Sequence, residues 1–108
     1  MFEHINNNLK LCVSLAKIPG FLGFKLHNYG YSLNKLNFFY LPLRVDDLAA
    51  AVKGFKAFGF HAMSITMPFK NEVLKYLDYV EPAALKVESV NSVLNTKKGL
   101  YGYSTDYS

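Results

Sequence analysis

The sequence predicts an α/β fold of three layers, α/β/α, with a mostly parallel sheet and a C-terminal β-hairpin. Three short apolar runs alternate with amphipathic stretches, a pattern typical of strand–helix–strand units. Two further strand-like runs near the end flank a Lys-Lys-Gly turn, as in a hairpin. With 108 residues, 51% of them hydrophobic and 19% charged, the chain has the size and composition of one globular domain, residues 1–108.

The first strand is predicted at residues 9–16, where apolar residues alternate with polar ones and then run together. Residues 17–24 contain Pro19 and two glycines and are expected to form a loop. A helix is expected at residues 25–36, with large apolar side chains at spacings of three and four residues. These side chains are Leu26, Tyr29, Leu33 and Leu36.

A second strand is predicted at residues 37–45, with Pro42 placing its end near an edge of the sheet. The next helix is expected to start after Asp47, because an Asp-Asp pair supplies an N-cap and negative charge for the first turn. Gly59 is expected to end this helix. Its apolar stripe consists of Leu48, Val52 and Phe55.

The third strand is predicted at residues 61–66, followed by a helix at 68–77, because a proline at position 68 favours a first helical turn. A short helix is expected at residues 82–87. The last two strands, at residues 88–95 and 100–104, are expected to form the hairpin.

The charge and cysteine content exclude some classes of function. The net charge of +4 comes from 12 Lys and Arg residues against 8 Asp and Glu residues, and the basic residues are dispersed. Arg44 is the only arginine, whereas specific base recognition favours arginine, so nucleic-acid binding ranks far below the other hypotheses.

The single cysteine, Cys12, favours a reducing compartment. With no signal pattern and no membrane-length apolar stretch, a cytoplasmic location is expected.

Lys70 ends the run Ser-Ile-Thr-Met-Pro-Phe-Lys at residues 64–70, at a predicted strand-to-helix junction. Ligand sites in α/β sheets form at such strand ends. A lysine in a first helical turn lies at the positive end of the helix dipole, which favours a compensating anion or a functional role. The alternative, a solvated surface lysine, is about equally supported by the residues alone.

Asp106 and Asn91 are two further candidate site residues. Asp106 follows the last predicted strand in Gly-Tyr-Ser-Thr-Asp, and its alternative role is the N-cap of a following helix. Asn91 lies among apolar neighbours, so its amide needs either a ligand hydroxyl or a backbone carbonyl as partner. The sequence contains no Gly-x-Gly-x-x-Gly, no phosphate loop and no metal-ligand spacing, so no metal site is predicted.

Three motifs together resemble those of the shikimate dehydrogenase family, and the resemblance covers nearly the whole chain. The motifs are Ser-Ile-Thr-Met-Pro-Phe-Lys at 64–70, Glu-Ser-Val-Asn-Ser-Val at 88–93 and Gly-Tyr-Ser-Thr-Asp at 102–106. The family's usual forms are Asn-Val-Thr-x-Pro-Phe-Lys, Ala-Val-Asn-Thr and Gly-x-Asn-Thr-Asp, in the same order. His27 and Asn28 also match a His-Asn pair in the family's first helix.

The resemblance implies the N-terminal substrate-binding domain of an NADP-dependent dehydrogenase of the shikimate pathway. Its substrate would be shikimate, quinate or a related polyhydroxylated cyclic acid. The resemblance also implies that Lys70 and Asp106 form the catalytic pair beside the hydroxyl that is oxidised. By the same resemblance, Asn91 hydrogen-bonds a ring hydroxyl and Thr66 lines the pocket. Such a ligand needs several fixed polar groups, because its orientation decides which hydroxyl meets the nicotinamide.

The chain departs from the family's pattern at the Ser-x-Ser pair that holds the substrate carboxylate. Phe21 and Gly23 occupy these positions, counting back from the His-Asn pair. The run Leu-Cys-Val-Ser-Leu-Ala-Lys-Ile-Pro-Gly-Phe-Leu-Gly at residues 11–23 more closely resembles the shikimate-dehydrogenase-like subgroup. Either Ser14 or Lys17 is expected to supply the lost carboxylate contacts. Serine also replaces the family's Asn or Thr at positions 64, 92 and 104.

The family's nucleotide-binding domain follows the third motif, whereas this chain ends at Ser108. We therefore expect half of an enzyme, inactive alone, with no NADP bound to it and a missing or separate nucleotide-binding domain as its partner. A truncated reading frame, an excised domain and one piece of a split protein are all open. A second hypothesis is a non-catalytic remnant, a small-molecule-binding module of the same fold.

Overall fold

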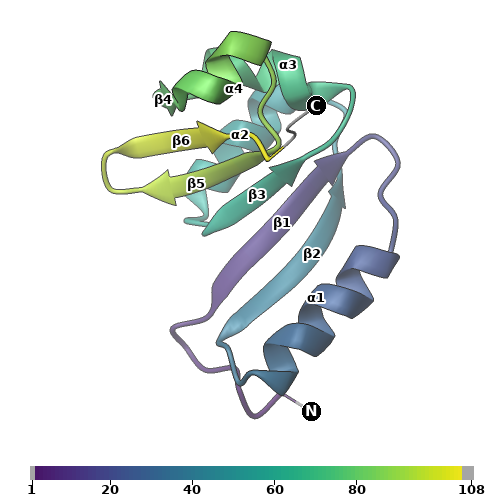
Figure 1. The fold of residues 1–108 in the computed structure, drawn as a ribbon. Helices are drawn as coiled ribbons and strands as arrows, with labels where there is room; N and C mark the ends of the chain where they lie inside the picture. Colours follow the sequence, from purple (N-terminus) through teal and green to yellow (C-terminus); the bar gives the residue numbers. More distant parts are fainter. Residues whose placement is uncertain (1, 106–108) are drawn as a thin grey trace.

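The computed structural model describes residues 2–105, and Figure 1 shows them as a twisted sheet with helices packed along it. In chain order the elements are β1 (Lys10–Ala16), α1 (Leu22–Leu33), β2 (Phe38–Arg44), α2 (Leu48–Ala57), β3 (Ala62–Ile65), α3 (Phe69–Glu72), the 3-10 helix η1 (Val73–Tyr76), β4 (Tyr79–Val80), α4 (Pro82–Val87), β5 (Ser92–Thr96) and β6 (Gly99–Tyr103).

The strands of this part of the chain form one sheet in the order β2-β1-β3-β5-β6-β4. β1 lies between β2 and β3 and is parallel to both, as the alternation of strands and helices predicts. β5 runs antiparallel to β3 and to β6, and β4 pairs in parallel with β6. The α/β fold with a mostly parallel sheet and a C-terminal hairpin is therefore confirmed.

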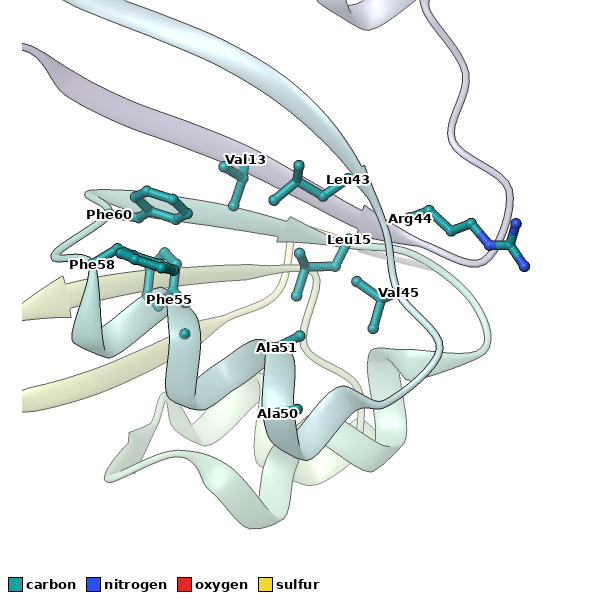
Figure 2. Close-up of a pocket in the computed structure, with 11 residues that line it drawn as sticks. Val13, Leu15, Leu43, Arg44, Val45, Ala50, Ala51, Phe55, Phe58 and Phe60 are labelled. Carbon is teal, nitrogen blue, oxygen red and sulfur yellow. The ribbon is translucent and has the colours of Figure 1, made fainter.

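Helices lie on both faces of the sheet. Side chains along a strand alternate between the two faces, so neighbouring residues of β1 contact different helices. Val13 and Leu15 of β1 point toward α2, as Figure 2 shows. Cys12 lies on the opposite face, where it lines a cavity together with His27 and Tyr31 of α1. The predicted α/β/α layering therefore follows from the alternation along β1.

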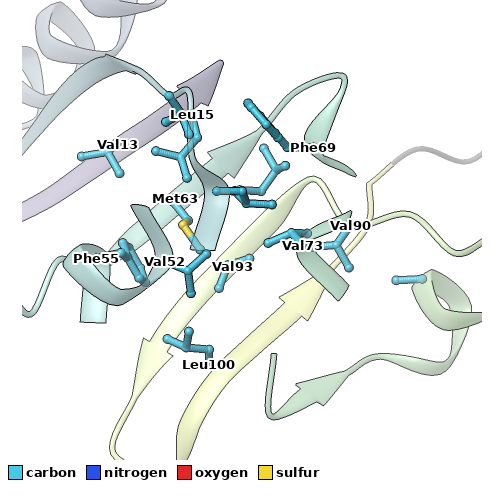
Figure 3. Packing of buried hydrophobic residues seen from close by; sticks show 14 residues of the cluster. Val13, Leu15, Val52, Phe55, Met63, Phe69, Val73, Val90, Val93 and Leu100 are labelled. Atoms are coloured by element: carbon cyan, nitrogen blue, oxygen red, sulfur yellow. The ribbon is translucent and has the colours of Figure 1, made fainter. Parts of the chain in front are cut away.

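The hydrophobic core lies between the sheet and α2, with residues of α3, η1 and α4 beside it (Figure 3). Met63 of β3 and Val93 of β5 are at most 2% exposed. Val90 and Leu100 bring the C-terminal hairpin into the same cluster. Burial of one such side chain contributes roughly 1.5–3 kcal/mol. This shared core fixes the hairpin against β3.

Local sequence accounts well for α2. Oδ1 of Asp47 accepts a hydrogen bond from the Ala50 N–H at 3.2 Å, which caps the helix as predicted. The predicted apolar stripe is buried against the sheet, and Gly59 adopts a φ of +67° just after the helix. The buried residues are Leu48, Val52 and Phe55.

We expect Asp47→Ala to lower the free energy of unfolding by about 1 kcal/mol, because the Ala50 N–H loses its side-chain acceptor. Urea denaturation followed by circular dichroism measures this change. Asp46→Ala is the matched control, since Asp46 makes only an exposed ion pair with Arg44 at 3.6 Å. Equal losses in the two variants would contradict the capping role.

Some predicted boundaries are wrong. The helix predicted at 68–77 is divided into α3 and η1, and the strand predicted at 88–95 begins only at Ser92. Glu88, with a φ of 54°, ends α4 in the left-handed conformation, so the chain turns before the strand starts. The sequence pattern does not predict β4, because two residues are too few to show an alternation.

The first helix begins at Leu22 instead of residue 25 and ends at Leu33. Gly23 lets the first turn lie close to Tyr40 of β2, because a Cβ at this position would lie 3.2 Å from the Tyr40 hydroxyl. The Asn28 amide bonds both backbone groups of Tyr40: Nδ2 donates to its carbonyl at 2.9 Å, and Oδ1 accepts from its N–H at 2.7 Å. These contacts hold α1 against the outer strand, β2.

Candidate functional site

The ends of several strands lie together along one side of the sheet, which is called the site edge here. β1 and β3 end there, because Leu15 pairs with Ile65 near their C-terminal ends. The antiparallel strand β5 begins at the same edge, where Ser92 pairs with Tyr103, the last residue of β6. Ligand sites in α/β sheets form at the carboxyl ends of strands. The predicted site residues are located relative to this edge.

Thr66 directly follows β3 and is bonded to the end of β1. Its Oγ1 donates a hydrogen bond to the Leu15 carbonyl at 3.0 Å, and its N–H donates to the same carbonyl at 3.3 Å. The Thr66 carbonyl in turn accepts from the Phe69 N–H at 2.9 Å, at the first residue of α3. The threonine therefore links the ends of two strands to the helix that carries Lys70.

Lys70 is half-buried on α3, beside the segment that leads into β5. Its carbonyl accepts a hydrogen bond from the Val90 N–H at 3.0 Å. Nδ2 of Asn71 donates to the Glu88 carbonyl at 2.9 Å, which fixes the same pair of segments. The carbonyl of Asn91 accepts from the Ile65 N–H at 2.8 Å. Backbone hydrogen bonds thus bring the segments of Thr66, Lys70 and Asn91 together.

The side chain of Asn91 holds the residues that follow β6. Its Nδ2 donates to Oγ1 of Thr105 at 2.8 Å, and its Oδ1 accepts from the Thr105 N–H at 3.2 Å. The hydroxyl of Ser92 also donates to this Oδ1 at 3.1 Å. Among the described residues, the amide therefore bonds a backbone N–H and two hydroxyls. Asp106 lies outside the described residues.

Ser14 belongs to a row of polar residues that crosses the sheet. It pairs with Ser64 of β3, Ser64 pairs with Ser92 of β5, and Ser92 pairs with Tyr103. Ser14 is 8% exposed, whereas Lys17, the other candidate for carboxylate binding, is exposed after β1. The sequence does not predict this row, because it depends on the strand order.

A cavity of about 250 Å³ lies on the same face of the sheet, between the strands and α1. Ser64 and Ser92 line it from the strands, and His27 stacks on Tyr40 at its wall with ring centroids 4.4 Å apart. The sequence signals His27 only through the His-Asn pair and does not single out Tyr40.

Two ionisable side chains that line this cavity, Cys12 and Tyr31, are uncharged at neutral pH. Burial raises the pKa of the Cys12 thiol, while a hydrogen bond with Tyr31 opposes this shift. Burial, together with the neighbouring Cys12, raises the pKa of Tyr31 to about 12. Both groups are therefore protonated at neutral pH, and an anionic ligand here would meet no negative charge from them.

A second cavity, of about 380 Å³, lies on the opposite face between β1, β2 and α2 (Figure 2). Its walls are mostly apolar, with Arg44 at one end. None of the predicted site residues lines it. Within residues 2–105, no group of three or more His, Cys, Asp or Glu side chains is arranged to hold a metal ion. In the same residues, no helix is both long and apolar enough to cross a bilayer.

Comparisons with known proteins agree on one family. Residues 17–93 match the profile described as the shikimate dehydrogenase substrate binding domain. A shikimate dehydrogenase-like protein of Haemophilus influenzae is 39% identical over 95% of this chain and 38% of its own length. The NADP(+) shikimate dehydrogenase of Carboxydothermus hydrogenoformans is 36% identical over 84% of this chain and 36% of its own length.

Solved structures show the same likeness. A shikimate 5-dehydrogenase-like protein superposes with a TM-score of 0.89 at 39% identity, covering 95% of this chain and 38% of that protein. The Listeria monocytogenes shikimate 5-dehydrogenase, solved in complex with shikimate and NAD, superposes with a TM-score of 0.86 at 33% identity. That match covers 98% of this chain and 38% of the Listeria protein. This chain thus spans a little over a third of the length of these relatives.

Proposed function

The chain belongs to the family of shikimate dehydrogenase substrate-binding domains, and from this membership we propose that it binds the substrate of an NADP-dependent dehydrogenase. The substrate class is shikimate, quinate or a related cyclic acid with several hydroxyls. The observation that carries the proposal is the set of backbone hydrogen bonds that joins the segments of Thr66, Lys70 and Asn91 at one sheet edge. We further propose that residues 1–108 form one substrate-binding domain that acts in the cytoplasm.

In this proposal Lys70 and Asp106 act on the hydroxyl that is oxidised. The secondary hydroxyl would give its proton to Nζ of Lys70 while its carbon gives up a hydride to the NADP that a nucleotide-binding domain would hold, and Asp106 would orient the lysine and relay the proton. The half-buried position of Lys70 beside the start of β5 supports this role. Asn91 supports it as well, since it holds Thr105, the neighbour of Asp106 in the chain.

Three further side chains are proposed to orient the ring. Thr66 donates its hydroxyl proton to the Leu15 carbonyl, so its oxygen is set to accept from a substrate hydroxyl. Asn91 hydrogen-bonds a ring hydroxyl. Ser14 belongs to the row of polar residues that crosses the sheet. Its hydroxyl would bind the substrate carboxylate in place of one serine of the family's Ser-x-Ser pair, and Lys17 is the alternative. Phe21, which occupies one family serine position, is 62% exposed and offers no such contact.

The described residues contain no Gly-x-Gly-x-x-Gly turn between a strand and a helix. A dinucleotide fold needs glycines that leave an open cradle for the pyrophosphate at the start of a helix. Gly23, in the first turn of α1, instead packs beneath the ring of Tyr40. We therefore assign the hydride acceptor, NADP, to a separate nucleotide-binding domain and expect no NADP binding by these residues. Tight NADP binding to the 108-residue chain would overturn this assignment.

Titration of shikimate and quinate into the 108-residue chain tests the proposed site. We expect at least one of the two acids to shift the amide NMR signals of Thr66, Lys70 and Asn91. Thr66→Val removes the hydroxyl while keeping the shape of the side chain, and it should weaken this binding about tenfold. Ser32→Ala, on the exposed side of α1, is the matched control and should leave affinity unchanged. An absence of binding by both acids would contradict the proposed substrate class.

A further inference from the structure

Strand β6, which leads toward Asp106, has a very short neighbour on one side. It lies between β5 and β4, and β4 contains only two residues (Figure 1). The paired residues of β4 and β6 are Tyr79 with Tyr101 and Val80 with Gly102. Soon after β4, Pro82 begins α4, and a proline has no backbone N–H to donate. The regular pairing on this side of β6 therefore ends before the chain reaches the site edge.

Two carboxylates continue this pairing beyond the ends of β4. Oδ2 of Asp78, just before β4, accepts a hydrogen bond from the Leu100 N–H at 2.8 Å. Oε1 of Glu81, just after β4, accepts from the Ser104 N–H at 3.1 Å. The backbone N–H of each acid also donates to β6, to the Leu100 carbonyl at 2.9 Å and to the Gly102 carbonyl at 3.0 Å. The two side chains thus take the place of ladder carbonyls on either side of β4.

The two acids act at opposite ends of β6. Asp78 binds next to the hairpin turn, away from the site edge, whereas Glu81 binds Ser104, the first residue after the strand. On the other side of β6, Oδ1 of Asn91 accepts from the Thr105 N–H. Side chains from both sides therefore hold the backbone where it leaves the sheet. Because Ser104 is only 8% exposed, water is a poor substitute for the Glu81 carboxylate there.

We propose that Glu81 is a positioning residue for the reaction. Together with Asn91 it fixes the two residues after β6, and thereby the direction in which the chain continues to Asp106. This inference rests on the proposed role of Asp106 beside Lys70. Glu81 needs no contact with the substrate, because its effect passes through the backbone. An oxygen acceptor is sufficient for this role, so Glu81→Gln should preserve it and Glu81→Ala should abolish it.

Amide hydrogen exchange of the 108-residue chain tests the hydrogen bond itself. We expect Glu81→Ala to speed exchange of the Ser104 N–H at least about tenfold, and Glu81→Gln to keep it within about threefold. Asp78→Ala should speed exchange of the Leu100 N–H instead. Urea denaturation should show similar losses of stability in the two alanine variants. An unprotected Ser104 N–H in the unaltered chain, or an unchanged rate in Glu81→Ala, would overturn the proposal.

Steady-state kinetics tests the effect on the reaction, in an enzyme that joins this domain to a nucleotide-binding domain. We expect Glu81→Ala to lower kcat about tenfold with little change in KM, because Asp106 loses its alignment while the proposed ring contacts remain. Glu81→Gln should restore kcat to within about twofold. Asp78→Ala is the matched control, since it loses the same kind of hydrogen bond at the far end of β6, and it should leave kcat unchanged.

The outcomes separate this inference from the proposed function. If Asp106→Asn lowers kcat and Glu81→Ala does not, Glu81 is not a positioning residue, although the proposed function stands. If Asp106→Asn leaves kcat unchanged, the proposed catalytic pair is wrong and the inference about Glu81 falls with it. Equal losses of kcat in Glu81→Ala and Asp78→Ala would overturn the inference in favour of a general loss of stability. Equal losses in Glu81→Ala and Glu81→Gln would overturn it in favour of an effect of charge.

Discussion

Lys70→Ala is expected to lower kcat by about 1,000-fold in an enzyme that joins this domain to a nucleotide-binding domain. The proton of the substrate hydroxyl loses its acceptor, while the proposed ring contacts of Thr66 and Asn91 are retained. Substrate affinity should therefore change by only about a factor of three. Steady-state kinetics gives kcat, and titration of the 108-residue chain gives affinity without turnover.

Lys75→Ala is the matched control for this variant. Lys75 is exposed on η1, close to Lys70 in the chain, and its ammonium lies over the ring of Tyr76 at 5.5 Å. Its removal should leave kcat unchanged. An unaltered kcat in Lys70→Ala would contradict the catalytic role. Equal losses of kcat in both variants would indicate a general disturbance of α3 and η1.

Gly99→Ala is expected to lower the free energy of unfolding by about 3 kcal/mol, the largest stability effect predicted for this chain. Gly99 begins β6 with a φ of +133°, where side chains are strained. An added Cβ would also collide with the carboxylate of Asp78, whose Oδ2 accepts from the Leu100 N–H at 2.8 Å. Thermal unfolding should show a midpoint lower by about 15 °C.

Two other glycines separate the causes of this loss. Gly59 has a φ of +67° with open space around it, so Gly59→Ala should cost only the backbone strain, about 1 kcal/mol. Gly20 has open space and no positive φ, so Gly20→Ala should be close to neutral. If Gly99→Ala costs no more than Gly59→Ala, the contact with Asp78 is not a source of the loss.

Features that depend on neighbours in the sequence were predictable. The cap by Asp47 and the stripe of Leu48, Val52 and Phe55 are set by residues within ten positions of each other. The hairpin turn before Gly99 is local in the same sense. The division of residues 69–76 into α3 and η1 was not predictable, because apolar spacing is similar in the two kinds of short helix.

Features that depend on strand order required the structure. The spacing of Leu26, Tyr29 and Leu33 predicts a helix correctly, yet it does not say which side of the helix meets the sheet. Here Asn28 and the neighbouring aromatic side chains occupy the inner side, and the apolar residues remain outside.

The candidate site shows the same limit. The sequence motifs name Thr66, Lys70 and Asn91, and the structure places their backbones together. The row that joins Ser14 to Ser64 and Ser92 appears only once β5 is seen to run antiparallel beside β3. The roles of these side chains, and of Asp106, stay predictions.

The two hydrogen bonds between Asn28 and Tyr40 also limit how other strands can add to the sheet. The outer edge of β2 is a row of backbone groups that a strand of another molecule could extend into a fibril-like stack. The Asn28 amide occupies both polar groups of Tyr40 near the middle of that row. An incoming strand would have to displace α1 before it could pair along β2. Asn28 therefore protects this edge of the sheet against aggregation through strand pairing.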